Sequence, residues 1–132
     1  DGLFEKGSEK YIALERKIHV YEDSGYGKSY LKNPLIHNIV KKAFEIFDQV
    51  RYELLDWVIM PNHVHVLINP YPNFSLPKIV QSWKSYTARE ANLILGRKGQ
   101  FWMKDYFDRY IRSEEHLNKV IAYIDKNRQS IL

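Results

Sequence analysis

Two histidines separated by one residue, His63 and His65, are the side chains of this sequence best suited to hold a metal ion. They belong to the run His-Val-His-Val-Leu-Ile-Asn, which predicts a strand over residues 63–69. Because successive side chains of a strand alternate, both imidazoles are expected on one face. Two imidazoles can bind a divalent metal if a further ligand is present. A His-x-His pair alone is equally typical of surface or core histidines, so its neighbours decide the matter.

Tyr123 and Asn127 are four residues apart in a predicted helix that runs from the N-cap Ser113 to about Asn127. The buried face of this helix is expected to consist of Leu117, Val120, Ile121 and Ile124. Tyr123 and Asn127 then share one flank of that face with His116, and Lys119 lies near it. Tyrosine, with a free pKa of ~10, needs metal or charge assistance to attack phosphorus. The structural alternatives are a packing tyrosine and a C-capping asparagine.

The remaining elements must position these four side chains. Helices are predicted over residues 9–22, from the N-cap Asn33 and Pro34 onward, and over residues 75–95 until Gly96. Strands are predicted over residues 52–60, 63–69 and 107–112. This mixture favours an α+β fold with a largely antiparallel sheet covered by helices. One domain over residues 1–132 is expected, with an N-terminal helical part at about 9–49 and a catalytic core at about 51–127.

Composition excludes several classes of protein. The 132 residues contain no cysteine, which rules out disulfides, thiolate catalysis and cysteine-based zinc sites and suits a reducing compartment, so we expect a cytoplasmic protein. No apolar run approaches the ~20 residues that a membrane span requires, and no membrane partner is expected. The first residues do not have the pattern of a signal peptide. No nucleophile elbow of a serine hydrolase is present.

The formal charge of +4 is concentrated in the second part of the chain. Residues 1–75 hold 9 basic and 10 acidic side chains, whereas residues 76–132 hold 11 basic and 6 acidic ones. Basic groups attract phosphates, and aromatic rings stack on unpaired bases. The candidate DNA contacts are Trp83, Lys84, Arg89, Arg97, Lys98 and Trp102. The alternative is core packing for each tryptophan and a solvated side chain for each lysine or arginine.

Several runs together resemble one family. The run Trp57–Leu67, which contains Met-Pro-Asn-His-Val-His, resembles the His-hydrophobic-His strand of single-tyrosine ("HUH") transposases of single-stranded DNA. Three further runs resemble the REP-associated tyrosine transposase branch: residues 81–92, residues 101–112 and residues 122–127, the last being Ala-Tyr-Ile-Asp-Lys-Asn. The resemblance covers about residues 30–127. It implies a ferredoxin-like antiparallel sheet.

The resemblance also implies a role for each candidate residue. His63, His65 and Asn127 would hold Mg²⁺ or Mn²⁺, which accept imidazole and oxygen ligands. Tyr123 would attack the scissile phosphate of single-stranded, hairpin-bearing DNA and form a 5′-phosphotyrosine with a free 3′-OH. The metal would polarise the phosphate. Tyr106 and Tyr110 are rival nucleophiles, but the residues four positions later are Tyr110 and Glu114 rather than an asparagine.

Two features depart from the family pattern. No aromatic-rich first strand is found before Glu9, so this strand is expected to be missing and the histidine strand to have an open edge. After Asn127, the residues Arg-Gln-Ser-Ile-Leu replace the proline and short basic tail of the family. A homodimer is left open. The alternatives to a transposase are a hairpin-DNA-binding module without activity and a metal phosphodiesterase that uses water.

Overall fold

A computed structural model describes residues 17–27 and 29–131 of the chain. The elements in chain order are β1 (His19–Ser24), the 3₁₀ turn η2 (Tyr30–Lys32), α2 (Pro34–Glu45), β2 (Tyr52–Ile59), β3 (His63–Pro70), α3 (Leu76–Leu95), β4 (Phe107–Tyr110) and α4 (Glu114–Ser130). The strands form one antiparallel sheet in the order β2-β3-β1-β4. This is the ferredoxin-like βαββαβ arrangement with α4 added, which confirms the α+β prediction.

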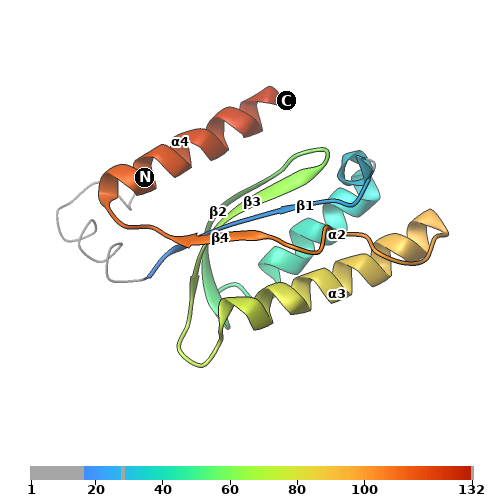
Figure 1. Ribbon diagram of the computed structural model, residues 1–132, viewed down its shortest axis with the longest axis horizontal. Coiled ribbons are helices and arrows are strands. Elements are labelled where there is room, and N and C mark those ends of the chain that lie inside the picture. The colour runs from blue at the N-terminus through green and yellow to red at the C-terminus, as the bar shows by residue number, and fades with distance from the viewer. Residues whose placement is uncertain (1–16, 28, 132) are drawn as a thin grey trace.

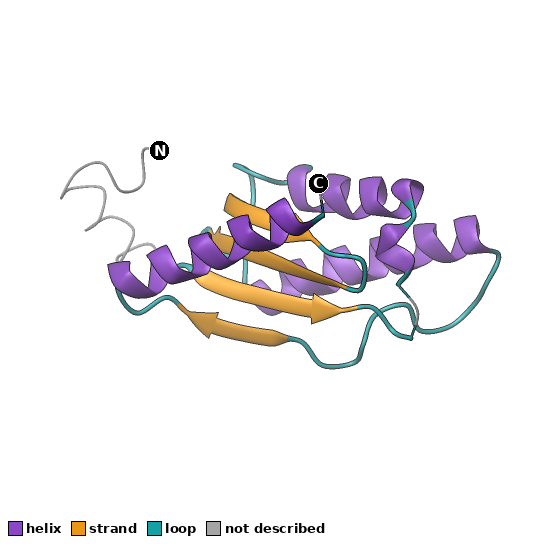
Figure 2. Ribbon diagram, turned by 90° about the horizontal axis from the view of Figure 1, so that it is seen from above, coloured by secondary structure: helices purple, strands orange, loops and turns teal. Residues whose placement is uncertain are grey.

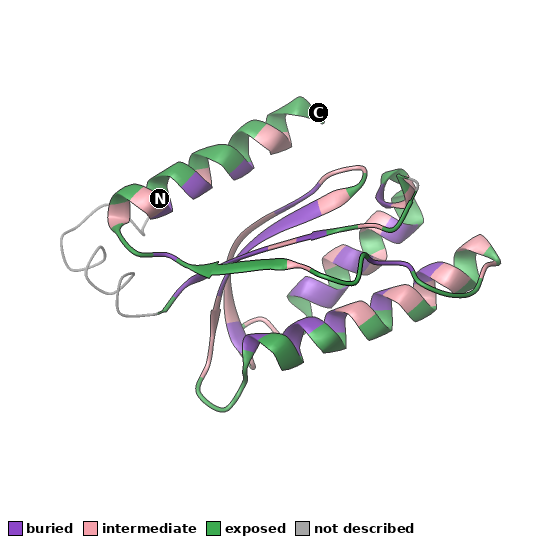
Figure 3. Cartoon of the chain, viewed as in Figure 1, coloured by how far each residue is buried: buried purple, intermediate pink, exposed green. Residues whose placement is uncertain are grey.

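The sheet separates two hydrophobic layers. Helices α2 and α3 cover one face, and α4 crosses the other face alone (Figures 1 and 2). The larger core lies between the sheet and the helix pair and includes Tyr21, Phe44, Val66 and Trp83. The smaller core lies under α4, where Leu117, Val120 and Ile124 contact apolar side chains of all four strands or their ends. Figure 3 shows the contrast between the buried central strands and the exposed edge strand β4.

Local sequence signals account for most helix boundaries. The side chain of Asn33 accepts a hydrogen bond from the Leu35 N–H at 2.9 Å, with Pro34 at the first helical position of α2. Gly96 has the left-handed conformation (φ 63°) that ends α3. Ser113 caps α4 by accepting from the His116 N–H. Helix α4 extends to Ser130, beyond the expected end at Asn127.

The prediction of a helix over residues 9–22 is wrong for residues 17–22, the part of that range which the structure describes. Residues 19–24 form β1, and the part of that predicted helix before residue 17 lies outside the described residues. Strand β1 pairs with β3 on one side and β4 on the other, and residues of both its faces are buried. A central strand covered on both faces lacks the alternation that identifies half-buried strands. Nothing in residues 19–22 therefore opposes extending a helix predicted from Ile12, Leu14 and Ile18.

Strand β1 also overturns the expectation that the first strand is missing. It occupies a central position in the sheet, next to the histidine strand β3. Because β3 is paired with β1 and β2, it has no open edge. Among the described residues, no helix is both long enough and apolar enough to span a bilayer.

Candidate active site

The face of the sheet beneath α4 carries both histidines. Along β3, Val64, Val66 and Ile68 point into the larger core, whereas the alternate positions face α4. His63 and His65 therefore share one face, as predicted, and their ring centroids are 4.8 Å apart with the ring planes at 90°. His65 is only 2 % exposed, and His63 is half-buried at the start of the strand.

The carboxylate of Glu22 in β1 determines the orientation and the tautomer of the His65 ring. Glu22 and His65 are directly opposite each other in the β1–β3 pairing, and Glu22 Oε1 lies 3.2 Å from His65 Nδ1. An N–H at Nδ1 that donates to this carboxylate leaves the Nε2 lone pair as the free acceptor. His65 Nε2 is buried and has no hydrogen-bond partner. The ring is thus oriented with an unused ligand atom inside the site.

The other ring of the pair is oriented in a similar way. His63 Nδ1 lies 2.8 Å from Asn62 Oδ1 in the turn that joins β2 to β3. A donating Nδ1–H at this contact again leaves Nε2 with the lone pair. Burial lowers the pKa of His65; the Glu22 carboxylate raises it, and the neighbouring His63 lowers it further. The net lowering favours the neutral imidazole, which is the form that binds metals.

Tyr123 reaches this histidine pair from α4. The rings of Tyr123 and His65 pack edge to face, with centroids 4.9 Å apart and planes at 88°. Burial of Val120 and Ile124 on either side of Tyr123 fixes the rotation of the helix over the sheet. Tyr123 itself is 51 % exposed, so a substrate can reach it. The two residues predicted from separate sequence motifs therefore lie in one site.

Asn127 lies one helical turn after Tyr123 on the same flank of α4. Its side-chain Nδ2 is buried without a hydrogen-bond partner. Rotating the amide by half a turn exchanges Nδ2 for Oδ1 with almost no change of shape, which would place an oxygen ligand there. Arg128 fixes this end of α4, because its Nη2 pairs with Asp56 and donates to the Trp57 carbonyl of β2 at 2.8 Å.

The donor set fits a divalent metal in composition. Two of its side chains carry the buried polar atoms without partners in the described part of the chain, His65 at Nε2 and Asn127 at Nδ2. Asn127 can serve as a ligand only through Oδ1, with the amide rotated. No group of three His, Cys, Asp or Glu side chains that could hold a metal occurs within residues 17–27 and 29–131. A third ligand would therefore have to be an amide oxygen, such as that of Asn127, or the substrate itself.

The rival tyrosines point elsewhere. Tyr106 packs against Tyr21, with ring centroids 5.3 Å apart, and so belongs to the larger core on the opposite face. Tyr110 packs on His19 at 4.2 Å, and His19 in turn contacts Asp108. Tyr110 in β4 and Tyr106 just before it therefore both face away from α4. Neither ring has a recorded contact with His63 or His65.

The two tryptophans predicted to contact DNA are core residues. Trp83 is 4 % and Trp102 is 6 % exposed, and their indole N–H groups donate to Tyr52 and Thr87 respectively. A ring buried in this way has no free face on which a base could stack. The prediction of DNA contacts for Trp83 and Trp102 is therefore corrected to core packing, which was the alternative for both.

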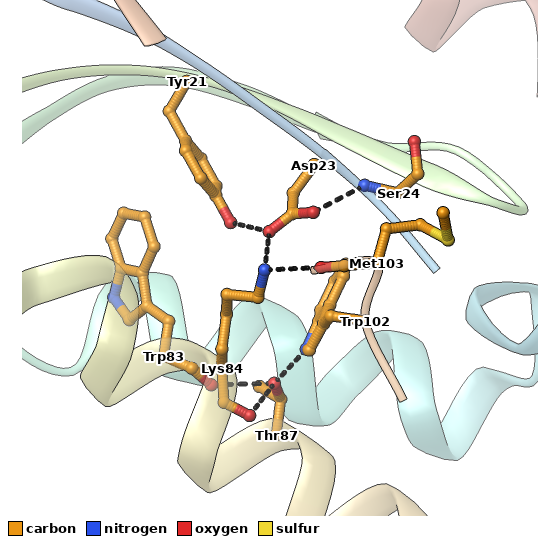
Figure 4. Close-up of polar contacts among 8 residues, drawn as sticks. All are labelled: Tyr21, Asp23, Ser24, Trp83, Lys84, Thr87, Trp102 and Met103. Carbon is orange, nitrogen blue, oxygen red and sulfur yellow. Dashed lines mark hydrogen bonds and ion pairs between the residues drawn. The ribbon is translucent and has the colours of Figure 1, made fainter. Parts of the chain in front are cut away.

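Lys84 is also a structural residue. Its Nζ lies 2.7 Å from Asp23 Oδ2 and donates to the Met103 carbonyl at 2.9 Å (Figure 4). The Asp23 side chain is fully buried and also accepts from the Tyr21 hydroxyl. A cation needed to balance a buried carboxylate is poorly available to a phosphate, so the predicted DNA contact of Lys84 is corrected to this internal ion pair.

The other predicted DNA contacts are on the side of α3. Arg89 is exposed and lies 3.6 Å from Glu90, while Arg97 donates to Asn92 and approaches the Tyr30 ring. Lys98 is exposed in the loop after α3. Helix α3 covers the face of the sheet opposite Tyr123 (Figure 1). Contact of these three residues with DNA stays a prediction.

Sequence reasoning missed three residues of the site. Glu22, Phe107 and Arg109 line the same cavity as His65 and Tyr123. His116 and Lys119, which were placed on or near the tyrosine flank, line it too. Phe107 and Arg109 could have been found from the period of two in the predicted strand. Glu22 could not, because its position depends on the unpredicted pairing of β1 with β3.

Comparisons with known proteins agree with this architecture. The sequence model of the family described as "Transposase IS200 like" matches residues 14–127. No curated protein sequence matches the chain.

Two solved structures are similar. One is a REP-associated tyrosine transposase bound to a REP hairpin, with a TM-score of 0.65 and 16 % identity; the match covers 82 % of this chain and 64 % of that chain. The other is a candidate transposase from Deinococcus radiodurans R1, with a TM-score of 0.58 and 21 % identity. That match covers 84 % of this chain and 89 % of the Deinococcus chain. The chain thus spans less than two thirds of the REP-associated protein. The family match extends over most of the chain, and the chain therefore belongs to the IS200-like transposase family.

Proposed function

We propose that this protein is a metal-dependent transposase or endonuclease that cleaves and rejoins single-stranded, hairpin-bearing DNA through a 5′-phosphotyrosine at Tyr123. The observation that carries the proposal is the contact of the Tyr123 ring with His65, whose Nε2 is buried without a partner. Membership of the family supports it. A structural neighbour is bound to a REP hairpin, which supports hairpin DNA as the substrate class.

The residues of the chain have distinct tasks in this reaction. The Tyr123 oxygen loses its proton and attacks the phosphorus; the bond from phosphorus to the 3′ oxygen breaks, and that oxygen takes up a proton. The 5′ end of the DNA is then joined to Tyr123. When a 3′-OH attacks the phosphotyrosine, a bond forms between that oxygen and phosphorus and the bond from phosphorus to the tyrosine oxygen breaks. The strand is resealed and the tyrosine is released without ATP.

His63, His65 and Asn127 are the residues that would hold the metal, Mg²⁺ or Mn²⁺. When bound, the metal supplies positive charge that polarises the scissile phosphate. Glu22 keeps the His65 ring oriented with Nε2 turned away from the carboxylate, and Asn62 does the same for His63. Arg128 holds the helix end that carries Asn127 against β2. In the proposed site, Tyr123 and these ligands would act together on the face of the sheet beneath α4.

Covalent trapping tests the proposal. A pool of hairpin oligonucleotides with randomised single-stranded flanks and a label at the 3′ end is incubated with the protein and Mn²⁺. A 5′-phosphotyrosine transfers the labelled fragment to the protein, which is seen on a denaturing gel. We expect Tyr123→Phe to abolish the labelled band. Tyr110→Phe is the matched control, since Tyr110 is 48 % exposed but lies on the other face of the sheet, and it should keep the band.

Each other outcome identifies a different function. A labelled band that persists in Tyr123→Phe contradicts the assignment of the nucleophile. Cleavage without any covalent band indicates a phosphodiesterase that uses water. Salt-dependent binding of the hairpins without cleavage in any divalent metal indicates a binding module.

A further inference from the structure

A cavity of about 560 Å³ opens beside Tyr123, between the edge of the sheet and the first half of α4. Its volume is within the range of ~300–1,000 Å³ that small ligands occupy in proteins. The apolar walls are Val20, Phe107, Val120 and Ile124. Tyr123 and His65 line it as well, so the cavity is continuous with the candidate active site. Apolar walls beside a reaction centre suit a planar group of the substrate.

Phe107 provides an aromatic surface in this cavity. It is 48 % exposed on the edge strand β4, and it lies on the face of the sheet that α4 covers. The guanidinium of Arg109, two residues later on the same face, lies 5.3 Å from the centroid of the Phe107 ring. An exposed ring next to a guanidinium is a surface on which a nucleobase can stack.

The opposite wall adds positive charge. Lys119 of α4 lines the cavity, and its side chain is 76 % exposed with Glu115 at 3.7 Å. Burial lowers the pKa of His116, and the nearby Arg109, Arg112 and Lys119 lower it further, so three cationic side chains gather around a mainly neutral His116 at this end of α4. The acidic residue of the lining, Glu22, is engaged with His65. The resulting field favours a phosphate.

We propose that this cavity binds the nucleotide whose 5′ phosphate becomes joined to Tyr123, with the base on Phe107 and the adjoining phosphates near Arg109 and Lys119. The inference rests on the proposed function and identifies a subsite of the same site. The phosphotyrosine keeps this nucleotide attached to Tyr123, so its sugar and base must lie close to that side chain. The cavity is lined by Tyr123 and His65, and His63 is not part of its lining among the described residues.

Nucleotide binding tests the subsite without any cleavage. Amide spectra of the ¹⁵N-labelled protein are recorded with 2′-deoxyadenosine 5′-monophosphate, with 2′-deoxyadenosine and with inorganic phosphate. We expect saturable shifts in β4 and the first half of α4 with the nucleotide, and weaker binding of both fragments. Equal affinity for inorganic phosphate would show an anion site only, and shifts elsewhere or no saturable shift would also overturn the inference.

Variants of the aromatic surface make the test specific. Phe107→Ala should weaken the binding of 2′-deoxyadenosine 5′-monophosphate by about tenfold, the loss expected for one base stacked on a ring. Phe107→Trp keeps an aromatic surface and should retain the affinity, while Phe107→Leu should not. Phe74→Ala is the matched control, because Phe74 is 38 % exposed and lines a different cavity before α3. Unchanged affinity in Phe107→Ala would contradict the base position.

The failure of this inference can be distinguished from the failure of the proposed function. If Tyr123 forms a covalent adduct at the same rate when the retained nucleotide is abasic, the function stands and the subsite is wrong. If the mononucleotide binds at Phe107 but no hairpin yields an adduct, the cavity is a nucleotide site and the proposed function is wrong. The expected result is mononucleotide binding together with an adduct rate that falls about tenfold for the abasic substrate.

Discussion

At the scale of single residues, the site depends on a contact between two neighbouring strands. His65 is buried, and its Nδ1 faces the Glu22 carboxylate at 3.2 Å while Nε2 has no partner. A carboxylate behind a ligand histidine fixes the tautomer and the orientation of the ring and makes the ligand more basic. Glu22 is therefore a positioning residue, which acts on the proposed metal through His65.

Replacing Glu22 should weaken metal binding. We expect Glu22→Ala to raise the Kd for Mn²⁺ about tenfold and Glu22→Gln, which keeps a hydrogen-bond acceptor, to raise it less. Titration calorimetry with MnCl₂ measures the affinity directly, and Glu45→Ala, on α2 across the sheet, is the control. Equal Mn²⁺ affinity in Glu22→Ala and the unchanged protein would show that this carboxylate has no part in the site.

The four proposed catalytic and metal-binding residues differ in how far the sequence could identify them. His63, His65 and Tyr123 were predicted from spacing and resemblance, and the structure brings their rings together. Their chemical roles remain predictions. The aromatic residues Trp83 and Trp102 were misassigned, because composition cannot distinguish a ring that packs in the core from one that stacks on DNA. Burial is a property of the folded chain as a whole.

At the scale of elements, a buried ion pair joins β1, α3 and the segment before β4. Asp23 lies within β1, and Lys84 from α3 reaches both its carboxylate and the Met103 carbonyl. The Met103 N–H in turn donates to the Ser24 carbonyl at 2.8 Å. The pair therefore connects the strand that carries Glu22 to the segment that leads into the strand carrying Phe107 and Arg109.

Removing the cation should destabilise the fold. Lys84→Met leaves the buried carboxylate of Asp23 without its partner, and we expect the free energy of unfolding to fall by about 3 kcal/mol near pH 7. Urea unfolding measures this loss. The double variant Lys84→Met/Asp23→Asn removes the charge as well and should recover much of the stability. If Lys84→Met were as stable as the unchanged protein, the ion pair between Lys84 and Asp23 would not be essential for stability.

The same variant should respond to pH in a defined direction. Burial raises the pKa of Asp23, and the hydrogen bonds from Lys84 and Tyr21 lower it by smaller amounts. Without Lys84 the pKa rises further, so the folded state binds this proton more tightly than the unfolded chain does. The unfolding free energy of Lys84→Met should therefore fall as pH rises from the usual aspartate pKa to the raised folded value. Urea unfolding midpoints of Lys84→Met and of the double variant, measured across that pH range, test whether the unfolding free energy falls as pH rises.

The C-terminal end of α4 should depend on one arginine. Arg128 pairs with Asp56 and donates to the Trp57 carbonyl, which holds the turn carrying Asn127 against β2. Because the Arg128 side chain is 42 % exposed, we expect Arg128→Ala to cost only about 1 kcal/mol of stability. Hydrogen exchange should nevertheless accelerate in the last turn of α4, whereas Lys126→Ala should leave it unchanged. Equal protection in Arg128→Ala would contradict the anchoring role.

Elements with strong end signals could be predicted from the sequence, and the central strand could not. Asn33, Ser113 and Gly96 marked helix ends correctly because capping is a local effect. The predicted helix over residues 9–22 includes most of β1, because a strand buried on both faces has no period of two. The same error concealed Glu22, since only the pairing of β1 with β3 places it beside His65.

At the scale of the whole molecule, basic side chains lie on two sides of the sheet. Arg109 and Lys119 line the cavity beside Tyr123, whereas Arg89 and Lys98 are on or just after α3, which covers the other face. The positive charge of the second part of the chain is thus divided between the tyrosine side and the α3 side. A single strand at the active site need meet only the first group, while a hairpin stem extends further.

This division predicts different salt dependences. For an unstructured oligonucleotide, Lys119→Ala should reduce the slope of log Kd against log salt concentration by about 1, and Lys98→Ala should leave it unchanged. For a hairpin substrate, both variants should reduce the slope. Fluorescence anisotropy over a salt series measures it. If Lys98→Ala and the unchanged protein had identical slopes with hairpin DNA, the α3 side would not contact the DNA.

Locating the covalent bond is the most direct test of the proposed reaction. After reaction with hairpin DNA and Mn²⁺, nuclease trimming and trypsin digestion leave a nucleotide mass on the peptide that carries the nucleophile. We expect this mass on Tyr123, in the peptide that follows Lys119 and ends at Lys126. A nucleotide attached to Tyr106 or Tyr110 instead, or DNA cleavage with no modified peptide, would contradict the assignment of Tyr123 as the nucleophile.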